Sequence, residues 1–385
     1  MIIKRPIYDQ QLKNVATEVI IKETIDDQMK LEKELVNLIH ASDTNQPLFV
    51  PYILKPIFEL GDHSFENPVI FKVRAKDVGE SLPLEEIKES PHSIALLVET
   101  PQQLAWLNFA EYIALSEFLM SQADVTRVVE YSKSNHRKVI GYGLLQPQNF
   151  DRCKSMSMDF FCGDFIMKPN EQNCDNTASN KLTVIELINR LQQDDVDLNM
   201  VIKLIRADPL LSFQVLRVAN SVAFSGVQSV DSIDQAVVRL GLKNLKHWVM
   251  VLSMNNISSK PIEVVESGLI RATMAKKIAE KQGKIEQKSA YTAGLLSVLD
   301  SLLDMPMPKI MEKTALDEDV RAAILDRSGE LGELLTSVVA YEEGLWDSLA
   351  SDQIYGVDLS EIYIESLESV TQEKQTLQGS MKNNE

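Results

Sequence analysis

The spacing of apolar residues changes about halfway along the chain, and this change most constrains the fold. Up to about residue 170, short runs of β-forming residues alternate with longer polar stretches. From Leu182 onward, apolar residues recur at helical intervals, as Leu182, Ile185 and Ile188 illustrate. Since the two patterns require different architectures, the sequence predicts an α/β layer or barrel followed by an all-helical domain.

The N-terminal half contains a series of runs typical of buried strands. Helix-like sequence separates several of them, for example at 123–134 ahead of the run at 139–142. This alternation of strand and helix favours a parallel sheet. The predicted strands are 17–22, 48–50, 69–73, 94–99, 112–115, 139–142 and 160–162.

The domain boundary is predicted at a polar run that has no side chains to anchor a core. A chain of 385 residues is long enough for about two domains. The run at 171–180 is rich in Asn, Asp, Gln, Ser and Thr, which is typical of a linker. We therefore expect domains at 1–170 and 181–370, joined by this linker and followed by a disordered polar tail at 371–385.

Helix boundaries in the second half carry recognisable signals. Asp208 precedes Pro209, which is the order expected of an N-cap and a first helical residue. Ser232 or Asp231 can cap the next helix, while glycines at 241 and 283 stand where helices are predicted to end.

Charge and composition exclude several classes of function. The chain has 39 basic and 56 acidic residues and a formal net charge of −17, which opposes direct binding to nucleic acid. Apolar runs such as 94–98 are far shorter than the roughly 20 residues of a membrane span, and no secretory signal is recognisable. We expect a cytoplasmic protein. Cys153, Cys162 and Cys174 have no zinc-site spacing and are expected to be inert thiols.

Local motifs predict no catalytic, cofactor or metal site. None of the five histidines has another His or a Cys at ligand spacing. Asp62 and His63 are the one acid-histidine pair, interpreted as a solvated loop, and His247 is interpreted as a packed residue beside Trp248. The Gly-Tyr-Gly run at 141–143 lacks the third glycine of a dinucleotide turn. The acidic pairs and triplets are interpreted as helix starts or solvated faces. They lie at 85–86, 194–195, 317–319 and 342–343.

The helical half resembles a known family through four segments. These are LIRADPLLSFQVLRVANSVAF at 204–224, SIDQAVVRLGLKNLKHW at 232–248, YTAGLLSVLDSLLDMPM at 291–307, and 319–346 with its RAAIL, GELGELL and VVAYEEGLW runs. They resemble the HDOD domain of bacterial signalling proteins that join EAL and HDOD domains. The resemblance implies an HD-like helical bundle that lacks the metal ligands of HD phosphohydrolases, because Ser297 and Val298 replace the HD pair. The family signature falls on Asn220, Ser221, Gly241 and Trp248, which also suit turn and packing roles.

The first half resembles a degenerate EAL domain, a TIM-type barrel that in active members hydrolyses cyclic di-GMP with two metal ions. RPIYDQQLKNVATEVIIKE at 5–23 is similar to its opening and DFFCGDFIMKP at 159–169 to its close. Only Glu18 retains a metal-binding carboxylate of the family. One carboxylate cannot hold two ions, so the resemblance implies a catalytically inactive barrel. The other family positions fall on or near Pro51, Lys72, Leu97, Val98, Ala114, Ser116, Tyr142, Leu145 and Cys162, with Glu99 one place after the Leu-Val pair.

The length of this half is a second departure from the family. A TIM-type barrel typically uses about 200 residues or more, and the first half has only about 170. The stretch between 73 and 94 also lacks the sequence of a full crossover helix. We therefore expect a shortened barrel that is incomplete or distorted.

These features support one principal hypothesis. The chain is expected to be a non-enzymatic bacterial signal-transduction protein whose HDOD domain binds other signalling proteins and whose EAL-like domain is a sensing or docking platform, without a cofactor. One alternative is a weak metal-dependent cyclic di-GMP phosphodiesterase built around Glu18 and Glu99. The other alternative is a receptor that binds cyclic di-GMP without hydrolysis, although arginine forks for phosphate are scarce at the mapped strand ends.

Overall fold

The chain forms two compact units in this computed structural model. The structure describes residues 1–22, 28–41, 46–60, 67–79, 82, 92–122, 124–170, 178–192, 198–224, 230–257, 260–349, 353–354 and 356–379. The first unit comprises Met1–Lys168, Ala340–Ile354 and Asp358–Ile364, and the second comprises Pro169–Val339, Tyr355–Val357 and Glu365–Glu385. The units differ from the predicted ranges because two late segments belong with the first half of the chain.

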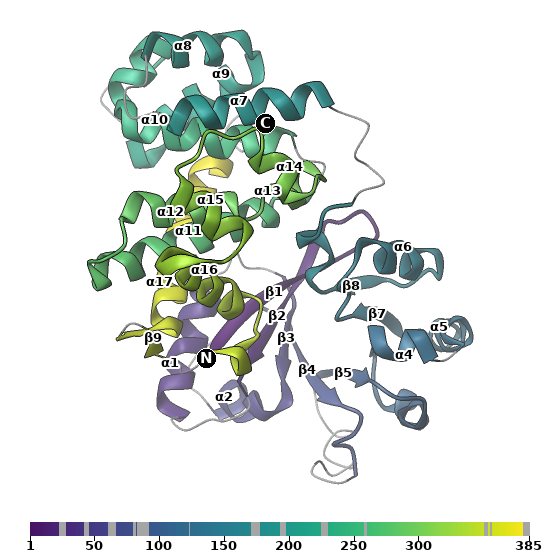
Figure 1. The fold of residues 1–385 in the computed structure, drawn as a ribbon. Helices are drawn as coiled ribbons and strands as arrows, with labels where there is room; N and C mark the ends of the chain where they lie inside the picture. The colour runs from purple at the N-terminus through teal and green to yellow at the C-terminus, as the bar shows by residue number, and fades with distance from the viewer. Residues whose placement is uncertain are drawn as a thin grey trace. The chain divides into compact units, whose positions relative to one another are not determined.

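The first unit is built on a closed barrel of eight strands (Figure 1). β1 is antiparallel to both of its neighbours, β2 and β8, and the successive pairs from β2 to β8 are parallel. Every predicted strand is confirmed within a few residues at its ends. The strands are β1 (Ile2–Tyr8), β2 (Asn14–Ile21), β3 (Leu48–Pro51), β4 (Val69–Arg74), β5 (Ser93–Val98), β6 (Tyr112–Ser116), β7 (Lys138–Tyr142) and β8 (Phe160–Cys162).

The expectation of an incomplete barrel is wrong. The sequence did not predict β1, whose middle residues Lys4, Arg5 and Pro6 interrupt the apolar pattern. This strand supplies the eighth position, and the pairs Ile7↔Cys162 and Tyr8↔Phe161 close the ring. An antiparallel strand needs only a short hairpin to join β2, so the barrel closes with fewer residues than a crossover would require.

Short helices connect or follow the strands of this unit. The predicted helix at 123–134 is confirmed as α5. The helical segments are α1 (Gln28–His40), the 3₁₀ turn η1 (Tyr52–Leu54), α2 (Lys55–Leu60), η2 (Pro101–Phe109), α4 (Glu117–Gln122), α5 (Val125–Ser134), α6 (Pro147–Ser155) and η3 (Asp164–Met167).

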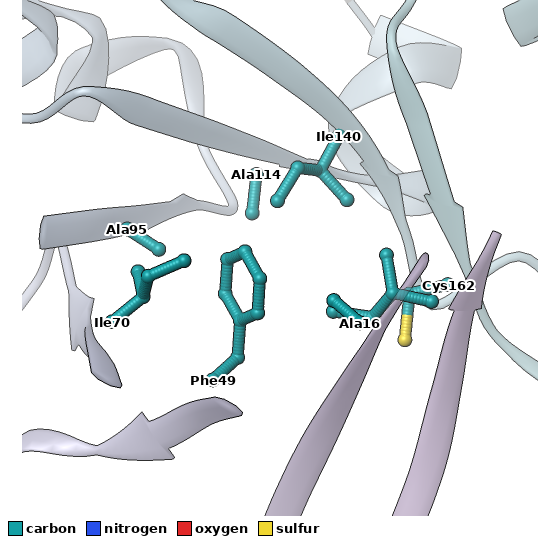
Figure 2. Packing of buried hydrophobic residues seen from close by; sticks show 8 residues of the cluster. Ala16, Phe49, Ile70, Ala95, Ala114, Ile140 and Cys162 are labelled. Carbon is teal, nitrogen blue, oxygen red and sulfur yellow. The ribbon is translucent and has the colours of Figure 1, made fainter. Parts of the chain in front are cut away.

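The interior of the barrel is filled by side chains. Each strand contributes one buried residue to a common layer, in which Phe49 lies among smaller side chains (Figure 2). Such alternating inward positions are the usual filling of a small barrel. The layer consists of Ile7, Ala16, Phe49, Ile70, Ala95, Ala114, Ile140 and Cys162.

The late segments of the chain cover β1. The hydroxyl of Tyr341 accepts a hydrogen bond from the Ile2 backbone N–H at 3.4 Å and donates one to the Ile2 carbonyl at 3.1 Å. Tyr363 accepts one from the Lys4 backbone N–H at 3.3 Å. Both tyrosines are buried and their rings lie 5.5 Å apart, with Trp346 packed against Tyr341. Because these contacts satisfy strand atoms and bury aromatic surface, residues from the end of the chain are part of the first unit.

The second unit is helical, as predicted. α11 and α12 pack closely, since a Cβ on Gly294 would lie 2.5 Å from the Ala272 backbone. The elements after the barrel are α7 (Ala178–Gln192), α8 (Leu198–Ala207), α9 (Pro209–Ala219), η5 (Val222–Phe224), α10 (Ile233–Ile257), α11 (Glu263–Gln282), α12 (Gln287–Leu296), α13 (Leu299–Leu303), α14 (Met307–Met311), α15 (Glu318–Leu325), α16 (Gly329–Glu342), η6 (Trp346–Ser348), β9 (Gln353–Ile354), β10 (Val357–Asp358) and α17 (Leu359–Gly379).

The predicted helix signals are found at their expected places. Asp208 caps α9 by accepting hydrogen bonds from the backbone N–H groups of residues 210 and 211. The hydroxyl of Ser232 caps α10, and Gly283 ends α11 in the left-handed conformation. Gly241, at φ 71° and ψ 161°, is non-helical and ends the first of the two helical segments that make up α10, as predicted. Within the residues placed by the structure, no helix is long and apolar enough to cross a membrane.

Candidate functional site

A charged cluster lies inside the barrel around Glu18, which has no exposed surface. The ammonium group of Lys72 forms an ion pair with Oε1 of this carboxylate. Tyr142 donates its hydroxyl hydrogen to the same oxygen at 2.7 Å, and the Cys162 thiol donates to Oε2 at 3.1 Å. Both carboxylate oxygens are therefore hydrogen-bonded within the protein.

The strand geometry explains why residues so far apart in sequence meet here. Side chains two residues apart on a strand point to the same side of the sheet. Glu18, Lys72 and Tyr142 each stand two residues after a member of the apolar layer, on β2, β4 and β7. They therefore form the next layer toward the carboxyl ends of the parallel strands, where TIM-type barrels place their functional residues.

Arg5 adds a second cation to this cluster. Its guanidinium donates to the Glu343 backbone carbonyl at 3.0 Å and lies 3.5 Å from the Asp164 carboxylate. Because β1 runs antiparallel to its neighbours, Arg5, two residues before the layer residue Ile7 and paired with Glu18, lies in the same layer as Glu18. Arg5 begins the motif at 5–23, but its strand was not predicted, so its place in the cluster was not expected.

Electrostatics keep Glu18 ionised. Burial by itself raises the pKa of a carboxyl group, but Lys72 and Arg5 outweigh it and hold the pKa of Glu18 below its usual range. Burial, and then the negative charge of Glu18, raise the pKa of Cys162 and of Tyr142 well above their usual values. The cluster is thus an ionised carboxylate with one ammonium partner and two neutral hydrogen-bond donors.

The cluster does not suit a pair of metal ions. A two-metal centre needs several carboxylate oxygens with free lone pairs. Here an ammonium group contacts the Glu18 carboxylate, where a metal ligand would have to bind its ion. Among the residues that the structure places, no three His, Cys, Asp or Glu side chains are arranged to hold a metal.

The residues carried over by resemblance meet only in part. Four of them meet, because the side chains of Lys72, Tyr142 and Cys162 all hydrogen-bond to the carboxylate of Glu18. Ala114 belongs to the apolar layer and Leu97 packs against it. Pro51 ends β3, Val98 is buried at the end of β5, and Ser116 ends β6.

Glu99 and Leu145 belong to a neighbouring feature. They line an open cavity of about 570 Å³ at the ends of β5, β6 and β7, together with residues of α4 and α6. Ser116 and Tyr142 also line this cavity, so Tyr142 connects it to the Glu18 cluster.

The signature positions of the helical unit have clear structural contacts. The Asn220 amide at the end of α9 donates to the Val230 carbonyl at 2.7 Å and accepts from the Val230 N–H at 2.7 Å, just ahead of α10. Ser221 donates its hydroxyl to the Val218 carbonyl, and Trp248 is buried.

The two residues that replace the HD pair, Ser297 and Val298, also have structural roles. Ser297 donates its hydroxyl to the Gly294 carbonyl at 2.7 Å. Val298 is fully buried. Neither side chain supplies the imidazole or carboxylate that an HD metal centre uses.

His247 takes part in a hydrogen-bonded chain that sequence reasoning missed. Its Nδ1 lies 3.0 Å from the Tyr291 hydroxyl and its Nε2 lies 3.1 Å from the Glu373 carboxylate. The three residues come from α10, α12 and α17. Burial is the main cause that raises the pKa of Tyr291, which therefore remains a neutral phenol. Spacing could not reveal this chain because its members are separated by 44 and 126 positions.

Several sequence predictions lie outside the described residues. These are the Asp62-His63 pair, the acidic pairs at 85–86 and 194–195, Cys174, most of the predicted linker and the end of the predicted tail. The first part of that tail, 371–379, is helical and ends α17.

Comparison with known proteins bears on the helical unit first. Residues 180–321 match the model of the HDOD domain. The chain carries an HDOD domain. It follows the eight-stranded mixed barrel, which confirms the predicted order of an α/β barrel and an HDOD domain.

Two relatives cover most of the chain. Cyclic di-GMP phosphodiesterase CdgJ of Vibrio cholerae serotype O1 is 26% identical over an alignment of 296 residues that covers 74% of this chain and 68% of CdgJ. YuxH of Bacillus subtilis strain 168 is 24% identical over an alignment of 311 residues that covers 74% of this chain and 76% of YuxH. Among solved structures, an HDOD domain protein of unknown function from Geobacter sulfurreducens is 17% identical, covers 50% of this chain and 91% of its own, and has a TM-score of 0.35. Of these three proteins, CdgJ is the one whose name states an activity, that of a cyclic di-GMP phosphodiesterase.

Proposed function

We propose that this protein is a non-enzymatic regulator of bacterial signalling. In this proposal the HDOD domain binds other signalling proteins, and the barrel is a catalytically inactive platform. The proposal assigns no cofactor and no metal ion to either unit.

The contact between Lys72 and Glu18 carries the proposal. A phosphodiesterase of the two-metal kind uses its carboxylates to fix two cations and to generate a hydroxide. In this barrel the charge of the buried carboxylate is balanced by an ammonium group of the chain itself. Metal binding at Glu18 would require the displacement of Lys72 and would place like charges together in a buried site.

Exposed apolar side chains on the HDOD domain support the binding role. Val238 on α10 is 84% exposed, and Leu210 and Phe213 on α9 are each more than half exposed. Large apolar side chains at such positions favour contact with partner proteins, because their burial releases ordered water.

The alternative is activity on, or binding of, cyclic di-GMP. The name of the relative CdgJ, a cyclic di-GMP phosphodiesterase, favours this alternative. The departure of this barrel at Lys72 argues against hydrolysis, while Arg5 in the Glu18 cluster is a guanidinium of the kind that binds phosphate.

Calorimetric titration of the full chain with cyclic di-GMP separates these functions. We expect no heat of binding and no linear dinucleotide product, with or without Mg²⁺ or Mn²⁺. Heat without product would indicate a receptor. Metal-dependent product that is lost in Glu18→Gln and retained in Glu130→Gln, an exposed control on α5, would refute the non-enzymatic function.

The binding role of the HDOD domain needs its own test. The full chain is the appropriate bait, because segments after residue 339 belong to the barrel unit. Proteins retained by the native chain should be lost with Val238→Ser, whereas Glu130→Gln should retain them. A retained set that is identical for both variants would contradict a role for this surface.

A further inference from the structure

The cavity at the ends of β5, β6 and β7 has walls of mixed character. Phe118 on α4 is 62% exposed and Leu145 after β7 is 52% exposed, although both line a concave surface. The volume of about 570 Å³ is that of a site for a small ligand or a side chain. Apolar walls of this kind favour an occupant with an apolar body.

Two carboxylates give the cavity its charge. Glu117 is held rigidly, because its Oε2 accepts a hydrogen bond from the Leu145 N–H at 2.6 Å and its Oε1 accepts one from the Asn149 amide at 2.5 Å. Glu99 also lines the cavity, and its carboxylate has no hydrogen-bond or ion-pair partner among the described residues. It is therefore available to a ligand.

The remaining charged group of the lining is already engaged. Arg152 on α6 donates from its guanidinium to the Met120 carbonyl at 3.0 Å. Two acids against one base leave the lining negative, in a chain whose net charge is −17. Such a field attracts cations and repels phosphates.

We propose that this cavity binds an ammonium or guanidinium group carried on an apolar body. Glu99 pairs with the cation, Glu117 adds negative potential, and Phe118 and Leu145 contact the apolar part. The aromatic face of Phe118 further favours a cation. This proposal goes beyond the function proposed above, since it assigns a ligand to the barrel and depends on neither HDOD partners nor cyclic di-GMP.

The cationic group on an apolar body has two possible sources, which are a free organic amine and an Arg or Lys side chain of a peptide. Phenethylammonium represents the first and the capped dipeptide acetyl-Phe-Arg-amide the second. Neutral 2-phenylethanol and anionic phenylacetate have the same apolar body without the positive charge. Amide chemical shifts of Gly143 and Leu145 in the full chain report occupancy, because both residues line the cavity.

We expect at least one cation to shift these amides at millimolar concentration and to bind about 5-fold more tightly than 2-phenylethanol, the upper range for a partly exposed ion pair. Glu99→Gln should remove that difference, and Glu130→Gln should preserve it. A preference for the peptide over the free amine would identify a protein segment as the source.

Three results would overturn the proposal. The first is that phenylacetate binds as tightly as the cations or more tightly, which would point to Arg152 as the charged partner. The second is that Glu99→Gln binds every ligand with the affinity of the native chain. The third is that no ligand shifts the amides. The affinities of the four ligands are also compared on the native chain. That comparison still tests the proposal if a variant fails to fold. None of these results bears on the HDOD interaction, which is measured by partner retention.

Discussion

Replacing Lys72 with methionine tests the physical basis of the barrel cluster. The substitution keeps most of the side-chain volume and removes the ammonium group, leaving Glu18 buried with Arg5 as the nearby cation. Breaking a buried ion pair from one side typically costs about 3–5 kcal/mol. We expect a loss near 3 kcal/mol, because Glu18 is fully buried while Arg5 still lowers its pKa.

The matched variants form a double-mutant cycle. Glu18→Gln should cost less than Lys72→Met, since the Lys72 side chain is 17% exposed and Glu18 is not exposed at all. The double variant should be more stable than Lys72→Met by about 2 kcal/mol, because it no longer contains an unpaired buried charge. Lys138→Met, at an exposed position on β7, is the control for loss of a lysine.

Urea unfolding followed by tryptophan fluorescence measures these differences. Trp248→Phe in every variant removes the HDOD tryptophan, so that the signal comes from Trp106 and Trp346 of the barrel unit. A Lys72→Met variant within 0.5 kcal/mol of the parent, about the effect of an ordinary surface substitution, would refute the reasoning. A double variant no more stable than Lys72→Met would also refute it.

The pH dependence of the same cycle has a defined sign. The folded-state pKa of Glu18 lies below its unfolded value, so its contribution to stability is present above the unfolded pKa and is lost as pH falls through the folded pKa. Without Lys72 the pKa of Glu18 rises and the carboxyl group takes up a proton at higher pH. The difference between parent and Lys72→Met should therefore shrink as the solution is acidified.

Three further outcomes are expected. Tyr341→Phe should destabilise the barrel by about 1–3 kcal/mol in urea, since it removes the partner of both polar backbone atoms of Ile2; an unchanged midpoint would contradict the role of the late segment. Asp208→Ala should lower the unfolding free energy of the HDOD domain by about 1 kcal/mol, because the α9 cap is lost. Trp248 fluorescence in urea follows this unfolding, and Asp231→Ala, which leaves the α9 cap in place, is the control. In a Cys174→Ser background, Cys162 should resist maleimide at pH 8 in the native state and react in urea, because burial keeps its thiol protonated; rapid native labelling would show that the cluster is open.

The sequence predicted the parts of the fold that local patterns encode. Strands β2 to β8 alternate or run apolar because their inward side chains fill the barrel, and that pattern is visible without the structure. The helix caps at Asp208 and Gly283 depend on neighbouring residues alone. The resemblance to the EAL family, and not periodicity, singled out Glu18 and its partners on β4, β7 and β8 as positions.

Only the tertiary structure determined how these positions interact. Closure through β1 depends on pairing with β8 at the other end of the barrel sequence, and its polar centre hid it from a search for apolar runs. The contact of Lys72 with Glu18, and the place of Arg5 beside them, follow from strand order and register.

The clearest case is the return of the chain to its own beginning. Tyr341 satisfies the backbone of Ile2 from 339 positions away, and no local pattern announces this pairing. Sequence periodicity fixes which face of an element is buried, because that depends on residues a few positions apart. The partner that buries that face is decided by packing and hydrogen bonding across the whole chain, which exists only once the chain has folded.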